Sequence, residues 1–189
     1  MKKIAIFASG SGTNAESIIN YFSDYKNINV ELILSNKPDA LVLERAKKYQ
    51  IPYTTFTKKE LYENENVKNL LVDKQIDLIV LAGFLLLIPS YLVEAYPNRI
   101  INIHPALLPK YGGKGMYGKR VHQKVIDNKE KETGISIHYV NEKYDDGDII
   151  HQEKCRVYAT DTPASLAERV HQLEYQAYPR VIEQLLKNL

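Results

Sequence analysis

Short, mainly apolar runs recur through the first half of the sequence and constrain the fold more than any other feature. Four of them cover residues 4–8, 30–34, 76–82 and 100–103, and a shorter one covers 52–56. Runs without polar alternation are typical of parallel strands that are buried on both faces. Between them lie stretches long enough for helices. Right-handed βαβ crossovers then predict an α/β fold with an open, mostly parallel, Rossmann-like sheet and helices on both faces.

Three segments carry signals for the first turn of a helix. In two of them a Thr is followed three residues later by Glu, the pattern of a capping box. These pairs are Thr13 with Glu16 and Thr57 with Glu60. The third is Thr162 before Pro163, where Thr can cap and Pro suits the first helical position. The helix that follows has a predicted buried stripe of Leu166, Val170, Leu173, Ala177, Val181 and Leu185.

The second half of the chain has a less regular pattern. A Gly-rich segment at residues 111–118 precedes a predicted helix at 119–127. Two strand-like runs, at 134–140 and 149–157, flank an acidic turn. Because no repeat, linker or low-complexity stretch divides the sequence, we expect a single domain, 1–189.

Composition and charge exclude several classes of protein. The sequence has 25 Lys and Arg against 23 Asp and Glu, and the Lys residues are dispersed, so no nucleic-acid footprint stands out. The longest apolar run, residues 78–88, is well short of the roughly 20 residues that span a bilayer. Cys155 is the only cysteine, which excludes an internal disulfide and fits a reducing compartment. We treat Cys155 as structural and expect a cytoplasmic protein with small-molecule partners.

A loop of small residues, GSGTNA at residues 10–15, lies between the first predicted strand and the first predicted helix. Backbone N–H groups and the helix dipole favour a phosphate at such a place. The loop also fits a dinucleotide fingerprint, which needs an acidic residue about 20 positions on. The second apolar run is followed instead by Ser35 and Asn36. We therefore favour a monophosphate over a dinucleotide, and the alternative is a tight turn that binds nothing.

Asn102 and His104 lie at the end of the fourth long apolar run, and Pro105 follows them. Ligands of open α/β sheets bind beyond the carboxyl ends of the strands. Side chains two apart on an extended chain point to the same side, so an amide donor and a titratable imidazole can face one reacting atom. That pairing suits acyl transfer, in which one group stabilises an oxyanion and the other moves a proton. The alternative is that both side chains only satisfy loop backbone.

Asp145, Asp146 and Asp148 place three carboxylates in one short turn. A carboxylate near His104 would raise the pKa of the imidazole and keep it cationic, or fix its tautomer. One alternative is an acidic hairpin turn in water. Another is a cation site, but oxygen-ligand loops space their acids more widely, so we expect no metal.

The other four histidines give weaker signals. Strand alternation places His138 on the face opposite its isoleucine neighbours, either beside the site or partly exposed. We expect His122 and His151 to be ordinary surface or packing residues. His171 and Glu174 are three apart on the last predicted helix and share a face, which can contact a ligand but is more often solvated.

In order and spacing, motifs along nearly the whole chain resemble those of the folate-dependent formyltransferase family, and within it the glycinamide ribonucleotide formyltransferases. The matching segments are residues 9–14, 34–37, 81–84 and 102–111, the turn at Asp145, and Glu174 followed by Tyr178 and Pro179. The resemblance implies transfer of the formyl group of 10-formyltetrahydrofolate to the amine of glycinamide ribonucleotide in de novo purine synthesis. It implies neither a metal nor a covalent enzyme intermediate.

The resemblance also implies roles for individual residues, with phosphate bound by the N-terminal half and folate by the C-terminal half. The phosphate and ribose contacts would be Gly12, Thr13, Asn14, His171 and Glu174. The folate contacts would be Leu85, Leu86, Leu87 and Ile88, mainly through backbone groups, with Asn102 and Asp145. The catalytic residues would be Asn102, His104 and Asp145. Asn102 and a protonated His104 would hold the oxyanion of a tetrahedral intermediate, while Asp145 keeps the imidazole cationic.

Several other functions remain open at this point. Methionyl-tRNA formyltransferases, formyltetrahydrofolate deformylases and sugar-nucleotide formyltransferases share the Asn-x-His-Pro core. We expect neither the extra C-terminal domain of the first nor the extra N-terminal domain of the second, since the sequence starts on its first predicted strand and ends at Leu189. An alternative from another class is a non-catalytic nucleotide-binding module, but this function gives the three catalytic candidates no role. The oligomeric state, monomer or homodimer, is also open.

Overall fold

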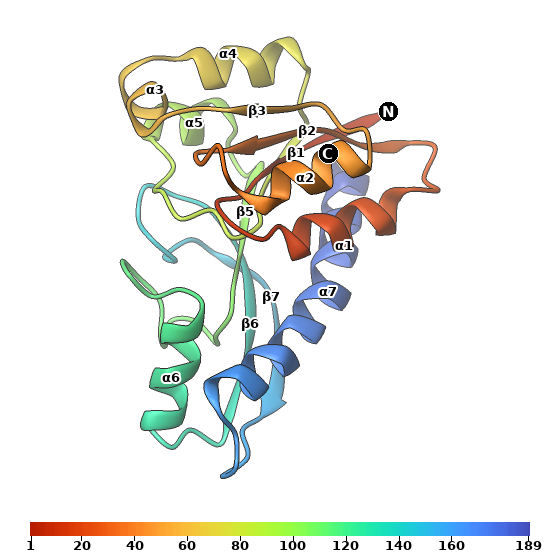
Figure 1. Cartoon of the computed structure of the whole chain (residues 1–189). Helices are drawn as coiled ribbons and strands as arrows, with labels where there is room; N and C mark the ends of the chain where they lie inside the picture. The colour runs from red at the N-terminus through yellow and green to blue at the C-terminus, as the bar shows by residue number, and fades with distance from the viewer.

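The computed structural model describes residues 1–189 as a seven-stranded sheet with helices on both faces (Figure 1). The strands are β1 (Lys2–Phe7), β2 (Ile28–Ser35), β3 (Tyr53–Thr55), β4 (Leu78–Leu81), β5 (Ile100–His104), β6 (Glu132–Tyr139) and β7 (Ile149–Arg156). The helices are α1 (Thr13–Phe22), α2 (Leu41–Lys48), α3 (Lys58–Glu63), α4 (Asn66–Asp73), α5 (Ser90–Ala95), α6 (Lys119–Asp127) and α7 (Pro163–Asn188). The first five strands pair in parallel, and β6 is antiparallel to β5 and β7. The predicted α/β fold is therefore confirmed.

The order of the strands places a change of direction between β1 and β4. Across the sheet the order is β3-β2-β1-β4-β5-β6-β7, so the chain winds outward from β1 to β3 and then returns to the other side. In open α/β sheets such a switch point leaves a crevice beyond the carboxyl ends of the strands. The segments that follow β1, β4 and β5 all lie at that edge.

Side-chain alternation along β1 explains why its apolar run is uninterrupted. Ile4 and Ile6 belong to a core cluster with residues of α1, α2 and α7. Ala5 and Phe7 belong to a second cluster, with residues of α3, α4 and α5. Because successive residues of a strand point to opposite faces, a strand with helices on both sides must be apolar throughout.

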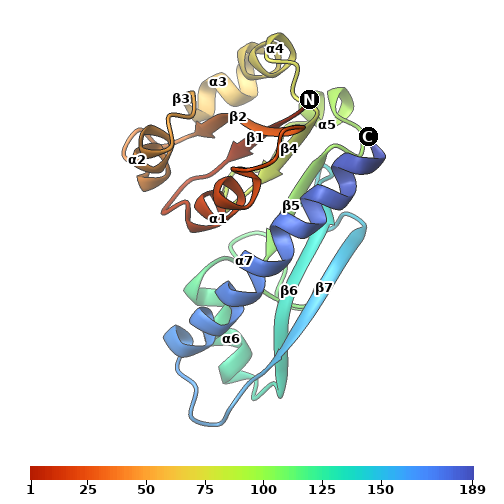
Figure 2. The same ribbon diagram turned by 90° about the vertical axis from the view of Figure 1, so that its right-hand side faces the viewer.

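The last helix, α7, crosses the sheet beside α1 and reaches down to α6 (Figure 2). In its predicted stripe Leu166, Val170, Ala177 and Val181 are buried, while Leu173 and Leu185 are partly buried against the core. Tyr178, which the predicted stripe did not include, is fully buried. Its hydroxyl donates to the carbonyl oxygens of Leu81 at 2.9 Å and Ile101 at 3.2 Å. The helix thereby bridges β4 and β5. No helix of the protein has the length and apolar composition needed to cross a membrane.

All three predicted helices begin where expected, but the cap predicted for the first of them is wrong. Thr57 and Glu60 form both hydrogen bonds of a capping box, and Thr162 caps α7 with Pro163 in its first turn. Thr13 and Glu16 form no such box, because Gly12 is the N-cap of α1 in the left-handed conformation. The Glu16 carboxylate pairs instead with cations of α2.

Candidate active site

A cavity of about 540 Å³ lies at the carboxyl ends of β1, β4 and β5. Its wall combines segments from both halves of the sequence. They are residues 10–14, 82–85, 102–105 and 113–118, with His122, Tyr144, Asp145, His171 and Glu174. The Gly-rich loop, the Asn102 segment and the acidic turn, which the sequence presents as separate motifs, therefore share one site.

The Gly loop after β1 presents unused hydrogen-bond donors. Gly12 has a φ of 72°, and a Cβ there would collide with Val42 of α2, so only glycine fits this close turn. The backbone N–H groups of Gly12, Thr13 and Asn14 have no acceptor within the chain. Free N–H groups at the first turn of a helix form a binding place for an anion.

Glu174 of α7 reaches the same loop from the far end of the sequence. Its side chain is buried, and Oε2 accepts a hydrogen bond from Asn14 Nδ2 at 2.8 Å. Asn14 Oδ1 is buried without a partner. Burial raises the pKa of Glu174 to about 7, although the bond from Asn14 acts in the opposite direction. His171, one turn earlier on α7, also lines the cavity, and burial lowers its pKa.

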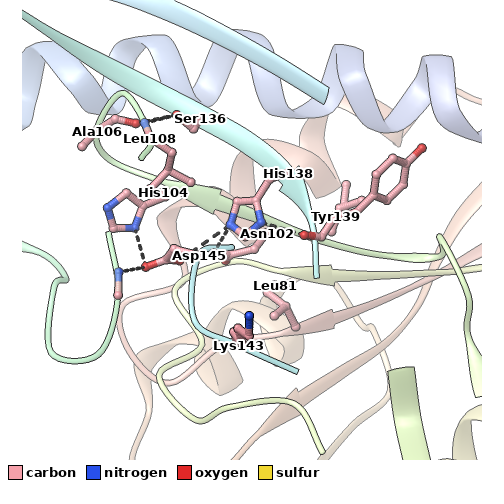
Figure 3. A network of polar contacts seen from close by, with 12 residues as sticks. Leu81, Asn102, His104, Ala106, Leu108, Ser136, His138, Tyr139, Lys143 and Asp145 are labelled. Atoms are coloured by element: carbon pink, nitrogen blue, oxygen red, sulfur yellow. Dashed lines mark hydrogen bonds and ion pairs between the residues drawn. The ribbon is translucent and has the colours of Figure 1, made fainter. Parts of the chain in front are cut away.

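The side chains of Asn102, His104 and Asp145 meet beyond the end of β5 (Figure 3). His104 Nδ1 lies 3.4 Å from Asp145 Oδ2, and Asn102 Nδ2 donates to Asp145 Oδ1, also at 3.4 Å. The other ring nitrogen of His104, Nε2, lies 2.8 Å from the carbonyl oxygen of Tyr111 and donates its proton there. The structure therefore brings together the three residues that the resemblance implied.

The backbone of the acidic turn holds the Asp145 carboxylate in place. Asp145 has a φ of 53°, a left-handed conformation that Asp adopts more readily than most residues. A Cβ on Gly147 would collide with the carbonyl oxygen of Tyr139, so the turn packs tightly on β6. Gly113 N donates to Asp145 Oδ2 at 2.9 Å. Burial acts to raise the pKa of Asp145, but its contacts with His138, His104 and Gly113 outweigh that effect and lower it.

The pKa of His104 is lowered, contrary to the expectation that Asp145 keeps this ring cationic. The ring is 3% exposed, and its burial outweighs Asp145 and the Tyr111 carbonyl, which both act to raise the pKa. A buried imidazole loses hydration that one carboxylate at 3.4 Å does not replace. His104 is therefore mainly neutral at pH 7, with its proton on Nε2.

His138 of β6 joins the three residues, a placement that the sequence had left open. It is buried, and its Nδ1 donates to the Tyr139 carbonyl at 2.7 Å. That bond leaves Nε2 as an acceptor, 3.1 Å from Asn102 Nδ2. His138 thus fixes which way the Asn102 amide points, and both amide hydrogens of Asn102 already have acceptors.

The structure also places residues that sequence analysis missed or put elsewhere. His122, expected to be a surface or packing residue, is 1% exposed on α6 and lines the cavity. Burial lowers its pKa to about 4, and Nδ1 has no hydrogen-bond partner. Its spacing on an amphipathic helix with Val121 and Val125 could have indicated burial but not its place in the cavity wall. No group of three or more His, Cys, Asp or Glu residues is arranged to hold a metal ion.

Of the six residues implied for folate, Leu85, Asn102 and Asp145 line the cavity, and Leu86, Leu87 and Ile88 do not. Ile88 is buried in the core beneath α5, and Leu86 packs against the same cluster. The carbonyl oxygen of Leu87 accepts a hydrogen bond from the Tyr62 hydroxyl at 2.7 Å. The chain turns inward after Leu85 because its apolar side chains complete the second core cluster.

Comparisons with known proteins agree with this arrangement. A sequence model described as formyl transferase matches residues 2–182. A curated relative from Bacillus subtilis, named phosphoribosylglycinamide formyltransferase, is 39% identical, and the alignment covers 98% of this chain and 95% of the relative. A relative from Arabidopsis thaliana, with the same name and called chloroplastic, is 42% identical, but the match covers 96% of this chain and only 64% of that protein. The crystal structure of phosphoribosylglycinamide formyltransferase from Bacillus halodurans superimposes with a TM-score of 0.87 at 39% identity, covering 98% of this chain and 95% of that one.

Proposed function

This chain belongs to the formyl transferase family, and we propose that it is an enzyme that transfers the formyl group of 10-formyltetrahydrofolate to the primary amine of N1-(5-phosphoribosyl)glycinamide. The reaction is a step of de novo purine synthesis. The names of the relatives from Bacillus and Arabidopsis support this substrate. We further propose a single-domain cytoplasmic protein whose partners are these small molecules.

One observation carries the proposal. The same cavity holds the free N–H groups of the Gly loop and the Asn102, His104 and Asp145 cluster. The loop suits a phosphate, and the cluster suits acyl transfer. A phosphorylated amine that accepts a formyl group needs both in one site.

The Gly loop and α7 would hold the accepting substrate. In this proposal the phosphate accepts hydrogen bonds from the N–H groups of Gly12, Thr13 and Asn14. The ribose hydroxyls would donate to the carboxyl group of Glu174. These donors would replace the hydration that burial removes, so substrate binding would favour the ionised carboxylate. His171 lines the same cavity as Glu174.

His104 would manage the proton of the attacking amine. The amine nitrogen forms a bond to the formyl carbon, and the carbonyl electron pair moves to oxygen, which gives a tetrahedral intermediate. Neutral His104 accepts the proton that the amine gives up, and the resulting imidazolium is stabilised by Asp145. Because Nδ1 faces Asp145, Nε2 is the nitrogen available to the reacting atoms. When Nε2 leaves the Tyr111 carbonyl, the ring proton moves through water to Nδ1, where it is donated to Asp145, and the free lone pair of Nε2 then accepts the proton of the amine. The electron pair of the oxyanion then re-forms the carbonyl group as the bond between the formyl carbon and the folate nitrogen breaks. The same proton, directly or through water, reaches the departing folate nitrogen.

Asn102 would stabilise the oxyanion of the intermediate. Its Nδ2 bonds His138 at 3.1 Å and Asp145 at 3.4 Å. The longer contact is the weaker one, so an oxyanion can replace it while His138 keeps the amide oriented.

For the folate, the apolar part of the cavity wall suits a flat ring system. Its side chains include Phe84, Leu85, Met116 and Tyr144.

The test is an absorbance assay with 10-formyl-5,8-dideazafolate, run with and without phosphoribosylglycinamide. We expect deformylation only when the amine substrate is present. The His104→Ala variant should lose about 10²- to 10⁴-fold in kcat while it retains substrate binding, as expected for a proton-transfer group. His151→Ala is the matched control, because His151 is a partly exposed histidine of β7 outside the cavity.

Other outcomes would point to other functions. Deformylation without the amine would indicate a hydrolase. Absence of any reaction by correctly folded protein would indicate a different acceptor amine, such as a sugar nucleotide, or a binding module. If the protein were a binding module, His104→Ala would bind the ligand as tightly as wild type, and neither protein would transfer a formyl group.

A further inference from the structure

Three consecutive peptide units of the Gly loop are held through their carbonyl oxygens. The bonds are Val42 N to Gly10 O at 3.1 Å, Arg45 Nε to Ser11 O at 2.7 Å and Glu16 N to Gly12 O at 2.9 Å. In a planar trans peptide the N–H points opposite to the C=O. The N–H groups of residues 11–13 are therefore directed away from these anchors, and none of the three has an acceptor in the chain.

Arg45 is the only side chain among the three anchors. The other two donors are backbone groups of α1 and α2, which those helices fix in place. Arg45 itself is fixed by an ion pair with Glu16. Glu16 also accepts from Lys48 at 3.0 Å and from the Tyr49 hydroxyl at 3.1 Å, so the guanidinium has a rigid, oriented partner.

The peptide unit that Arg45 holds is also the one most free to rotate. It joins Ser11 to Gly12, and glycine populates both signs of φ at little cost. Rotation of this unit by half a turn would replace the Gly12 N–H at the cavity by the Ser11 carbonyl oxygen. An anion would then face a partial negative charge. The 2.7 Å bond from Arg45 to that carbonyl opposes the rotation.

We propose that Arg45 is a positioning residue for phosphate binding, which locks the Ser11–Gly12 peptide so that Gly12 N–H faces the phosphate. Arg45 is not part of the cavity wall, so it acts through the peptide and not by touching the ligand. The inference rests on the proposed function for the identity of the phosphorylated substrate. Sequence analysis placed Ser11 within the candidate phosphate loop but did not point to Arg45.

The first experiment compares wild type with Arg45→Met, which keeps an unbranched side chain and removes the donor. We expect KM for phosphoribosylglycinamide to rise about tenfold, since a hydrogen bond to a charged group contributes about 1.5 kcal/mol. The kcat and the KM for the formyl donor should stay within about twofold, because neither depends on the phosphate. With the dephosphorylated substrate analogue, the two proteins should have equal kcat/KM.

Three further variants separate positioning from general stabilisation. Arg45→Lys retains a donor and should recover part of the lost affinity. Glu16→Gln loosens the hold on Arg45 but leaves the donor to Ser11 in place, so KM should rise by less than in Arg45→Met. Lys47→Met is the matched control, an exposed cation of α2 whose carboxylate partner is Glu44 and which makes no contact with the Gly loop. If Glu16→Gln raised KM as much as Arg45→Met, the ion pair alone would be responsible and the proposal would be overturned.

Calorimetry with ribose 5-phosphate tests the inference independently of catalysis. Arg45→Met should bind this probe about tenfold more weakly than wild type, in line with one lost hydrogen bond to a charged group. If wild type transfers no formyl group, the proposed function fails, and the ribose 5-phosphate affinities still decide the role of Arg45. Equal affinities, or an equal loss with the dephosphorylated analogue, would refute the positioning role.

Discussion

Replacement of Glu174 by Gln should change how the stability of the protein depends on pH. The carboxyl group has a pKa of about 7 in the folded protein and 4.5 as its ordinary value. Between these values the folded state binds a proton that the unfolded state has lost. Stability from this group is therefore fully present below pH 4.5 and is lost as pH rises through about 7. At about 1.4 kcal/mol for each pH unit, the loss is about 3 kcal/mol in total.

Gln keeps the shape of Glu and can accept the hydrogen bond from Asn14, but it does not ionise. We expect the free energy of unfolding of Glu174→Gln, relative to wild type, to rise by about 2 to 3 kcal/mol between pH 5 and pH 8. Urea unfolding of both proteins at several pH values measures this difference, and the titration of all other groups cancels. A difference that stays constant with pH would show that Glu174 is ionised in the folded protein, and the argument from burial would be wrong.

Two further predictions concern packing beside the cavity. Tyr178→Phe removes the hydroxyl that donates to the carbonyl groups of Leu81 and Ile101. We expect the free energy of unfolding, measured in urea, to fall by about 1 to 3 kcal/mol because two buried carbonyl groups lose this donor. An unchanged unfolding midpoint would contradict this prediction. Gly12→Ala places a Cβ against Val42 at a positive φ. The resulting strain of about 1 to 3 kcal/mol should lower the melting temperature and raise KM for the phosphorylated substrate. Gly10→Ala is the control for stability, since a Cβ there meets no atom within 4 Å. Equal melting temperatures for the two variants would refute the packing argument.

The features that could be predicted from the sequence depend on local periodicity. Apolar runs with helix-length spacing predict the parallel sheet, since burial on both faces leaves no polar position in residues 4–7 of β1. The spacing of Asn102 and His104 predicts that both point to one side, because strand geometry fixes alternate side chains. Asp145 was expected near His104 only through the resemblance, because no local rule brings together residues so far apart in the chain.

The features that could not be predicted depend on long-range contacts and on depth of burial. The capping pattern at Thr13 and Glu16 was misleading, because Arg45 of the next helix competes for the same carboxylate. The resemblance indicated the partner of His104 but not how deeply the ring is buried, and the burial decides the direction of its pKa. His122 was missed because only the packing of α6 against α7 places it at the cavity.

The seam between α1 and α7 has a consequence for how the protein folds. Its hydrogen bonds join residues 158 to 162 positions apart, Asn14 with Glu174, Ser17 with Tyr175 and Tyr21 with Glu183. Closing so long a loop costs chain entropy before the contacts repay it, so nearer pairings such as β1 with β2 form earlier. We therefore expect the cavity, which lies along this seam, to be completed after the sheet has formed. A ligand bound there should then slow unfolding and leave the rate of folding almost unchanged.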